Sequence, residues 1–178
     1  MASENDFNEK MLIHQVTGTY LVTDNLHSYP GQAVQTWHVY PPNNQEGYQG
    51  HLWDLIVADS ARELYWIRSK NVVDKKHWMH LQSSPNPLQE GDGALPNMQK
   101  FDDNQNRSNK DLQLWKLTKI ENESDTYAIH PHLYPECALG LQTNICATDR
   151  YVIAQYTWGR PTFHHYWRLS DPPAMIGN

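Results

Sequence analysis

Short segments in which apolar and polar residues alternate run along the whole chain, and three of them share one order of residues. Residues 51–55, 113–117 and 165–169 read His-Leu-Trp-Asp-Leu, Gln-Leu-Trp-Lys-Leu and His-Tyr-Trp-Arg-Leu. In each segment Trp and Leu stand two apart with a charged residue between them, which is the period of a β-strand with one buried face. We therefore expect three strands that bury Trp53, Trp115 and Trp167 in the core.

Two further patterns recur in the same order and extend the similarity beyond the tryptophans. A Tyr-x-(Val or Ile) pattern opens each copy, at Tyr20, Tyr65 and Tyr127. An apolar residue and a Gln then precede an aromatic residue, in residues 34–37, 98–101 and 154–158. Three patterns in one order, repeated three times, indicate repeats of about 18–62, 63–124 and 125–170.

The same patterns predict the fold class. No long segment carries the 3.6-residue apolar period of an amphipathic helix, whereas clusters of Pro, Gly and Asn mark turns between the apolar segments. One repeat alone cannot bury its Trp and Tyr side chains, but three repeats together can form a common core. We expect an all-β protein with three pseudo-symmetric repeats in a single domain that spans residues 1–178.

Charge and hydropathy exclude several classes of partner. The formal net charge is −6 and no basic run occurs, which argues against a nucleic-acid partner because such binding depends on clustered Lys and Arg. The first residues lack the basic and apolar regions of a signal peptide, and no apolar run is long enough for a membrane span. We therefore expect a soluble, cytoplasmic protein.

The chain offers little for catalysis or for metal binding. No Ser or Cys stands in a nucleophile motif and no glycine-rich phosphate loop occurs, so we do not expect an enzyme. The His-containing segments 77–80 and 130–132 lack acidic or Cys partners at ligand spacing, so no metal and no cofactor are expected. Cys137 and Cys146 are expected to be free, buried thiols, although a disulfide between them stays open.

Three repeats, each closed by (Gln or His)-x-Trp, resemble the ricin-B-type β-trefoil family. The resemblance implies a β-trefoil of about twelve strands, in which half of the strands close a barrel and half form hairpins that cap one end. It also implies a carbohydrate-binding lectin, in fungi a defence protein, whose partners are glycans or glycoproteins. The sugar, the number of active repeats and the oligomeric state stay open.

The first repeat matches the sugar-binding pattern of that family best. The resemblance implies that an aromatic side chain stacks on the apolar face of a sugar while a carboxylate accepts its hydroxyl hydrogen bonds. The residues expected to line this site are Asp24, Gln35, Trp37, Asn43 and Asn44. Sugar-binding members commonly carry Asn directly before the first residue of the closing motif, where this chain has Gly50, Leu112 and His164.

A second resemblance gives an alternative function. The segments Gly18-Thr19-Tyr20 and Trp167-Arg168-Leu169 are similar to the ends of fungal β-trefoil protease inhibitors of the mycocypin type. Such an inhibitor would contact a protease through surface loops, for which residues 29–31 and 83–96 are the candidates. Fold analogy cannot choose between a lectin and an inhibitor, because one fold carries many functions.

Overall fold

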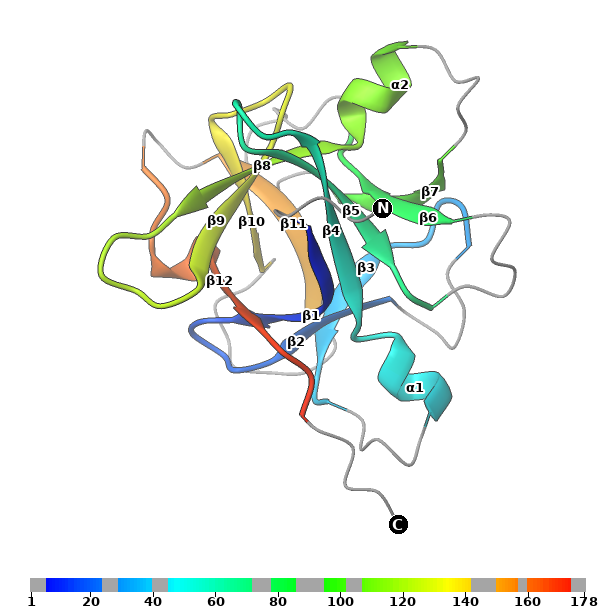
Figure 1. The fold of residues 1–178 in the computed structure, drawn as a ribbon, viewed down its shortest axis with the longest axis vertical. Coiled ribbons are helices and arrows are strands. Elements are labelled where there is room, and N and C mark those ends of the chain that lie inside the picture. Colours follow the sequence, from blue (N-terminus) through cyan, green and yellow to red (C-terminus); the bar gives the residue numbers. More distant parts are fainter. Residues whose placement is uncertain are drawn as a thin grey trace.

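The computed structural model describes residues 6–23, 29–39, 45–71, 78–85, 95–101, 107–141, 150–156 and 160–173 (Figure 1). The strands are β1 (Phe7–His14), β2 (Tyr20–Thr23), β3 (Val34–Trp37), β4 (Trp53–Asp59), β5 (Leu64–Ser69), β6 (Met79–Gln82), β7 (Asn97–Lys100), β8 (Leu114–Lys119), β9 (Thr126–Pro131), β10 (Cys137–Leu141), β11 (Arg150–Tyr156) and β12 (Tyr166–Ser170). The helical segments are α1 (Gln45–Gln49), α2 (Arg107–Leu112) and the 3-10 turn η1 (Phe163–His165). In the described part of the chain, no helix is long and apolar enough to cross a membrane.

Six of the strands close a barrel. β1 pairs with β4 and β12, β5 pairs with β4 and β8, and β9 pairs with β8 and β12, always antiparallel. The ring is therefore complete, and closure leaves these strands without a free edge.

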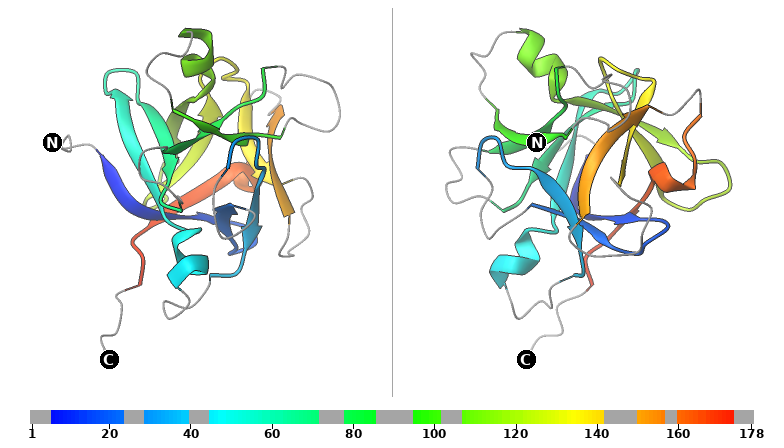
Figure 2. Two further views of the ribbon diagram at one scale, coloured as in Figure 1. Left: turned by 90° about the vertical axis from the view of Figure 1, so that its right-hand side faces the viewer. Right: turned by 180° about the vertical axis from the view of Figure 1, so that it is seen from behind.

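The other six strands form three hairpins, β2–β3, β6–β7 and β10–β11. Each hairpin follows the end of β1, β5 or β9 and precedes the start of β4, β8 or β12, so all three cap the same end of the barrel (Figure 2). The other end, where β4 leads into β5 and β8 into β9, is called here the uncapped end. This is the β-trefoil that the sequence predicts.

The three closing tryptophans occupy equivalent places in the core. Trp53, Trp115 and Trp167 are fully buried, as the alternation predicts. Each indole N–H donates a hydrogen bond to a backbone carbonyl oxygen on the first strand of the cap hairpin that precedes it in the chain. The acceptors are Leu21 on β2 (3.1 Å), Leu81 on β6 (2.8 Å) and Leu139 on β10 (3.0 Å). A buried N–H is costly without an acceptor, so this bond links each barrel strand to its cap.

The openers of the repeats do not all occupy equivalent places. Tyr65 pairs with Trp115 and Tyr127 pairs with Trp167, but Trp53 pairs with Lys10. The counterpart of β5 and β9 is therefore β1, and the prediction that Tyr20 matches the other two tyrosines is wrong. Tyr20 instead lies on β2 in a cap hairpin, because the pairing partner and not the local pattern determines a strand's place.

Phe7 on β1 provides the aromatic ring that packs with Tyr65 and Tyr127 in place of Tyr20. A register irregularity between Phe7 and Lys10 interrupts the pairing of β1 with β4. The ring centroid of Phe7 lies 6.0 Å from that of Tyr65 and 6.4 Å from that of Tyr127, and all three pack against the main core. We propose on this basis that the repeat units are β1–β4, β5–β8 and β9–β12; the single domain of residues 1–178 stays a prediction.

Candidate functional site

The structure describes two of the five residues of the predicted sugar site. Gln35 and Trp37 lie on β3 in the first cap hairpin. Asp24, Asn43 and Asn44 lie outside the described residues, so their part in the site stays a prediction.

Gln35 and Trp37 lie on the outward face of their hairpin, the face turned away from the main core, where Tyr20 packs against a smaller cluster of Met11, Tyr48 and Leu52. Thr36, between them, is fully buried, and neighbouring residues of a strand point to opposite faces. Across the hairpin Trp37 is directly opposite Tyr20, and Gln35 is opposite Val22. Because directly opposed side chains of an antiparallel pair lie on one face, Trp37 and Tyr20 form a half-buried aromatic pair.

The Gln of the middle pattern is not equivalent in the three hairpins. The leucines whose carbonyl oxygens accept the indole hydrogen bonds give a common reference point in the three hairpins. The residue directly before each of these leucines is paired, in turn, with Trp37, Gln99 and Gln155. Gln35 is therefore two residues away from the place that Gln99 and Gln155 share, and the first hairpin has an aromatic ring at that place.

The neighbourhood of Val22 departs from the sugar-binding pattern. A Cβ atom on Gly50 would lie 3.2 Å from Cγ2 of Val22 and 3.2 Å from the carbonyl oxygen of Gly47. Contacts this short require the neighbours to move, so the Asn that sugar-binding members carry at this place would not fit without a shift. A sugar at Trp37 must therefore form its amide hydrogen bond with a residue other than the one at position 50.

The register also limits how Asp24 can take part. Thr23, the last described residue before Asp24, pairs with Val34 and stands three residues from the Tyr20–Trp37 pair. Three residues of a strand span about 10 Å. A sugar held by both Asp24 and Trp37 must span this distance, or the chain after Thr23 must turn back toward Trp37.

The histidines in the closing segments have a structural role. Nδ1 of His165 accepts a hydrogen bond from the backbone N–H of Thr162 at 3.1 Å. Burial lowers the pKa of His165, and it lowers the pKa of His51 to about 4. Both imidazoles are therefore neutral at neutral pH, and neither provides a charge for a ligand.

Among the described residues, no group of three or more His, Cys, Asp or Glu side chains could hold a metal ion. Cys137 is a free, fully buried thiol, whereas Cys146 lies outside the described residues. Burial and the neighbouring Glu136 raise the pKa of Cys137 to about 11, so it is not a thiolate at neutral pH.

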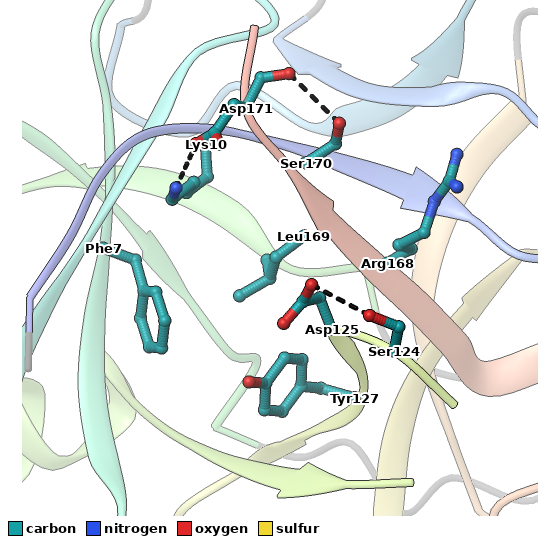
Figure 3. Close-up of a pocket in the computed structure, with 9 residues that line it drawn as sticks. All are labelled: Phe7, Lys10, Ser124, Asp125, Tyr127, Arg168, Leu169, Ser170 and Asp171. Atoms are coloured by element: carbon teal, nitrogen blue, oxygen red, sulfur yellow. Dashed lines mark hydrogen bonds and ion pairs between the residues drawn. The ribbon is translucent and has the colours of Figure 1, made fainter. Parts of the chain in front are cut away.

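A cavity of about 420 Å³ lies at the uncapped end of the barrel, between β1, β9 and β12 (Figure 3). Its lining residues are Phe7, Lys10, Ser124, Asp125, Tyr127, Arg168, Leu169, Ser170 and Asp171. They come from three distant segments of the chain that only the closure of the barrel brings together. The sequence patterns did not indicate this cavity, because its polar residues are far apart in the sequence and form no motif.

Comparison with known proteins places the fold. No protein-family model matches the sequence, and no curated protein matches it. The structure is similar to the designed threefold-symmetric protein ThreeFoil, with a TM-score of 0.69 and 18% identity over 92% of this chain and 98% of that chain. It is also similar to the Rhizoctonia solani agglutinin, with a TM-score of 0.64 and 14% identity over 93% of this chain and 96% of that chain.

A third similar structure is the C-half of the earthworm R-type lectin in complex with GalNAc, with a TM-score of 0.58 and 15% identity over 93% of this chain and all of that chain. Identities this low establish the fold and nothing more specific. The chain is thus a β-trefoil protein whose solved structural neighbours include lectins.

Proposed function

We propose that this protein is a non-catalytic lectin that holds a carbohydrate against Trp37. The observation that carries the proposal is the half-buried Trp37 ring on the outward face of a β-trefoil hairpin, directly opposite Tyr20. Two of the similar structures are an agglutinin and a lectin, and the second holds GalNAc, which supports a sugar as the ligand class.

The proposed contacts follow from the chemistry of a sugar. The apolar face of a pyranose stacks on an aromatic ring, and its hydroxyl groups exchange hydrogen bonds with amides and carboxylates. Trp37 supplies the ring and Gln35 an amide, while Asp24 and an amide from Asn43 or Asn44 complete the predicted site. Binding of one sugar is expected to be weak, because each hydroxyl hydrogen bond replaces one to water.

A glycan array followed by calorimetry with the best glycan tests the proposal. Trp37→Ala is expected to abolish binding and to leave the melting temperature nearly unchanged, because the ring lies outside the main core. Phe163→Ala is the matched control, since Phe163 is an aromatic side chain that is 57% exposed on another repeat, and it should bind like the natural protein. A natural protein that binds no glycan, or a Trp37→Ala variant that still binds, contradicts the proposal.

One feature favours the alternative of a protease inhibitor. Tyr29 is 50% exposed at the start of the predicted loop 29–31. The N–H of Gly31 donates to the carbonyl oxygen of Met98 at 2.7 Å, and the N–H of Met98 donates to that of Gln32 at 2.8 Å. A protruding residue next to a firmly held backbone suits docking into a protease cleft, because little order is lost on binding.

Inhibition assays with papain, trypsin and pepsin separate this alternative from the lectin. If the protein inhibits one of these proteases and Tyr29→Ala weakens the inhibition while Trp37→Ala does not, the protein is a protease inhibitor that acts through Tyr29. If no protease is inhibited, the alternative is excluded for these three classes of protease.

A further inference from the structure

The cavity at the uncapped end exists because of how the barrel closes there. At this end β4 and β5 are joined by residues 60–63, and β8 and β9 by residues 120–125. β12 and β1 also pair, with Ser170 opposite Met11, but no hairpin connects them. The cavity lies at this third junction, beside the hairpin that leads into β9.

One wall of the cavity is aromatic. Phe7 and Tyr127 lie edge to face, with ring planes at 62°. In the part of the chain that the structure describes, the Tyr127 hydroxyl has no hydrogen-bond partner, and Figure 3 shows it beside the open space in front of Phe7. Burial, and then the charges of Asp125 and Glu63, raise the pKa of Tyr127, so the hydroxyl keeps its proton and can donate.

The opposite wall is polar. The Ser124 hydroxyl donates to Oδ2 of Asp125 at 3.1 Å, which leaves acceptor capacity on the Asp125 carboxylate. The Lys10 ammonium forms an ion pair with Asp171, and the Lys10 side chain is 23% exposed. Figure 3 shows Lys10 above Phe7 and Asp125 above Tyr127, with Leu169 between them, whereas the Arg168 guanidinium points away from these side chains.

The charges argue against an anionic ligand. Lys10 is already paired with Asp171, and Asp125 adds a further negative charge. Among the described lining residues, a phosphate or carboxylate ligand would thus meet no unpaired cation that faces the space. A hydroxyl group both donates and accepts, which matches an Asp acceptor, a Tyr donor and a Lys donor in one small volume.

From these contacts we propose that the cavity binds a neutral pyranose sugar, with hydroxyl groups on Asp125, Tyr127 and Lys10 and the apolar sugar face against Phe7. The volume of about 420 Å³ lies within the range of small-ligand pockets. This site is distinct from the surface at Trp37 and does not depend on it, since the two lie on different strands and at different ends of the barrel.

The backbone at Asp125 allows a conservative test. Asp125 has a φ of 50°, a left-handed conformation that Asn tolerates as well as Asp does. Glu63 precedes β5 with a φ of 56°, so this conformation belongs to both hairpins and not to the ligand site alone. Asp125→Asn should therefore remove the charge and keep the fold, and Glu121→Gln is its matched control, because Glu121 is an exposed carboxylate on the same hairpin that does not line the cavity.

The test is NMR titration with free galactose, glucose, mannose and N-acetylgalactosamine and with their methyl glycosides, which stand for the end of a glycan. We expect a dissociation constant of about 1 mM for the best sugar, with shifts at the backbone amides of Asp125, Thr126 and Ser170. Tyr127→Phe and Asp125→Asn should each weaken binding about tenfold, since each removes a hydrogen bond or its charge. Tyr65→Phe, Glu121→Gln and Trp37→Ala should leave the affinity unchanged.

Several results would overturn the proposal. If no sugar shifts these amides at high millimolar concentration, the cavity is not a sugar site. If Tyr65→Phe weakens binding as much as Tyr127→Phe, the effect is structural. If Trp37→Ala alone removes all binding, the sugar lies at Trp37, so the lectin proposal stands and the second site is wrong. Binding that only free sugars show would restrict the ligand to a free monosaccharide.

Discussion

The indole N–H of Trp115 donates a hydrogen bond of 2.8 Å to the backbone carbonyl oxygen of Leu81, and both residues are fully buried. The ring therefore fills the barrel core and also holds the second cap hairpin to it. Trp115→Ala should lower the free energy of unfolding by about 3 to 5 kcal/mol, the usual cost of this core change. Urea denaturation measures this, and a loss below about 1 kcal/mol would show that the ring is not core.

Phe7 should contribute to stability although it stands at the start of the first strand. Its ring packs on Tyr65 and Tyr127 and is only partly buried. Phe7→Ala should cost about 2 kcal/mol, less than a fully buried aromatic residue, whereas the exposed control Phe163→Ala should cost under about 0.5 kcal/mol. Equal melting temperatures for the two variants would show that the packing of Phe7 on Tyr65 and Tyr127 adds nothing to stability.

Asp54 is a buried charge that depends on its partners. The residue is 1% exposed, and Oδ2 accepts hydrogen bonds from Nη2 of Arg68 at 2.7 Å and from Nε at 3.2 Å. Oδ1 accepts the backbone N–H of Glu9 at 3.0 Å. Arg68→Met should cost about 3 kcal/mol because it leaves the carboxylate buried without its main partner. The double variant Asp54→Leu/Arg68→Met should recover part of that loss in the same denaturation assay.

Stability should fall as the solution is acidified below pH 6.5. Burial lowers the pKa of His51 to about 4, and burial with the nearby Arg68 charge lowers the pKa of His80 to about 3. The unfolded state then binds protons that the folded state does not, so the full stability is present above pH 6.5 and is lost progressively down to about pH 3. Each of the two histidines should cost about 2 kcal/mol at pH 5.

Denaturation of the natural protein and of His80→Leu at pH 7 and pH 5 checks this dependence. The variant should lose less stability between the two pH values, because it lacks one of the buried histidines whose pKa is lowered. Nδ1 of His80 has no hydrogen-bond partner in the described part of the chain, so Leu at this place breaks no bond from that atom. The same pH dependence in both proteins would assign the effect to other groups.

The sequence by itself determined the strands that carry Trp53, Trp115 and Trp167, the burial of these rings and the threefold plan of the fold. A two-residue alternation is a local property, and it decides which side chains share one face of a strand. The family resemblance led to Gln35 and Trp37, which do share the outward face of one hairpin, although binding at that face stays a proposal.

Only the tertiary structure decided which strands become neighbours. Pairing is non-local, so Phe7 and not Tyr20 completes the ring cluster with Tyr65 and Tyr127, although Tyr20 has the matching local pattern. For the same reason Asp54 is buried whereas Lys116, at the same place in its Trp-x-Leu segment, is exposed, because only Asp54 is covered by β1 and Arg68. The cavity at the uncapped end is likewise a product of closure, since its walls come from segments that no spacing along the chain connects.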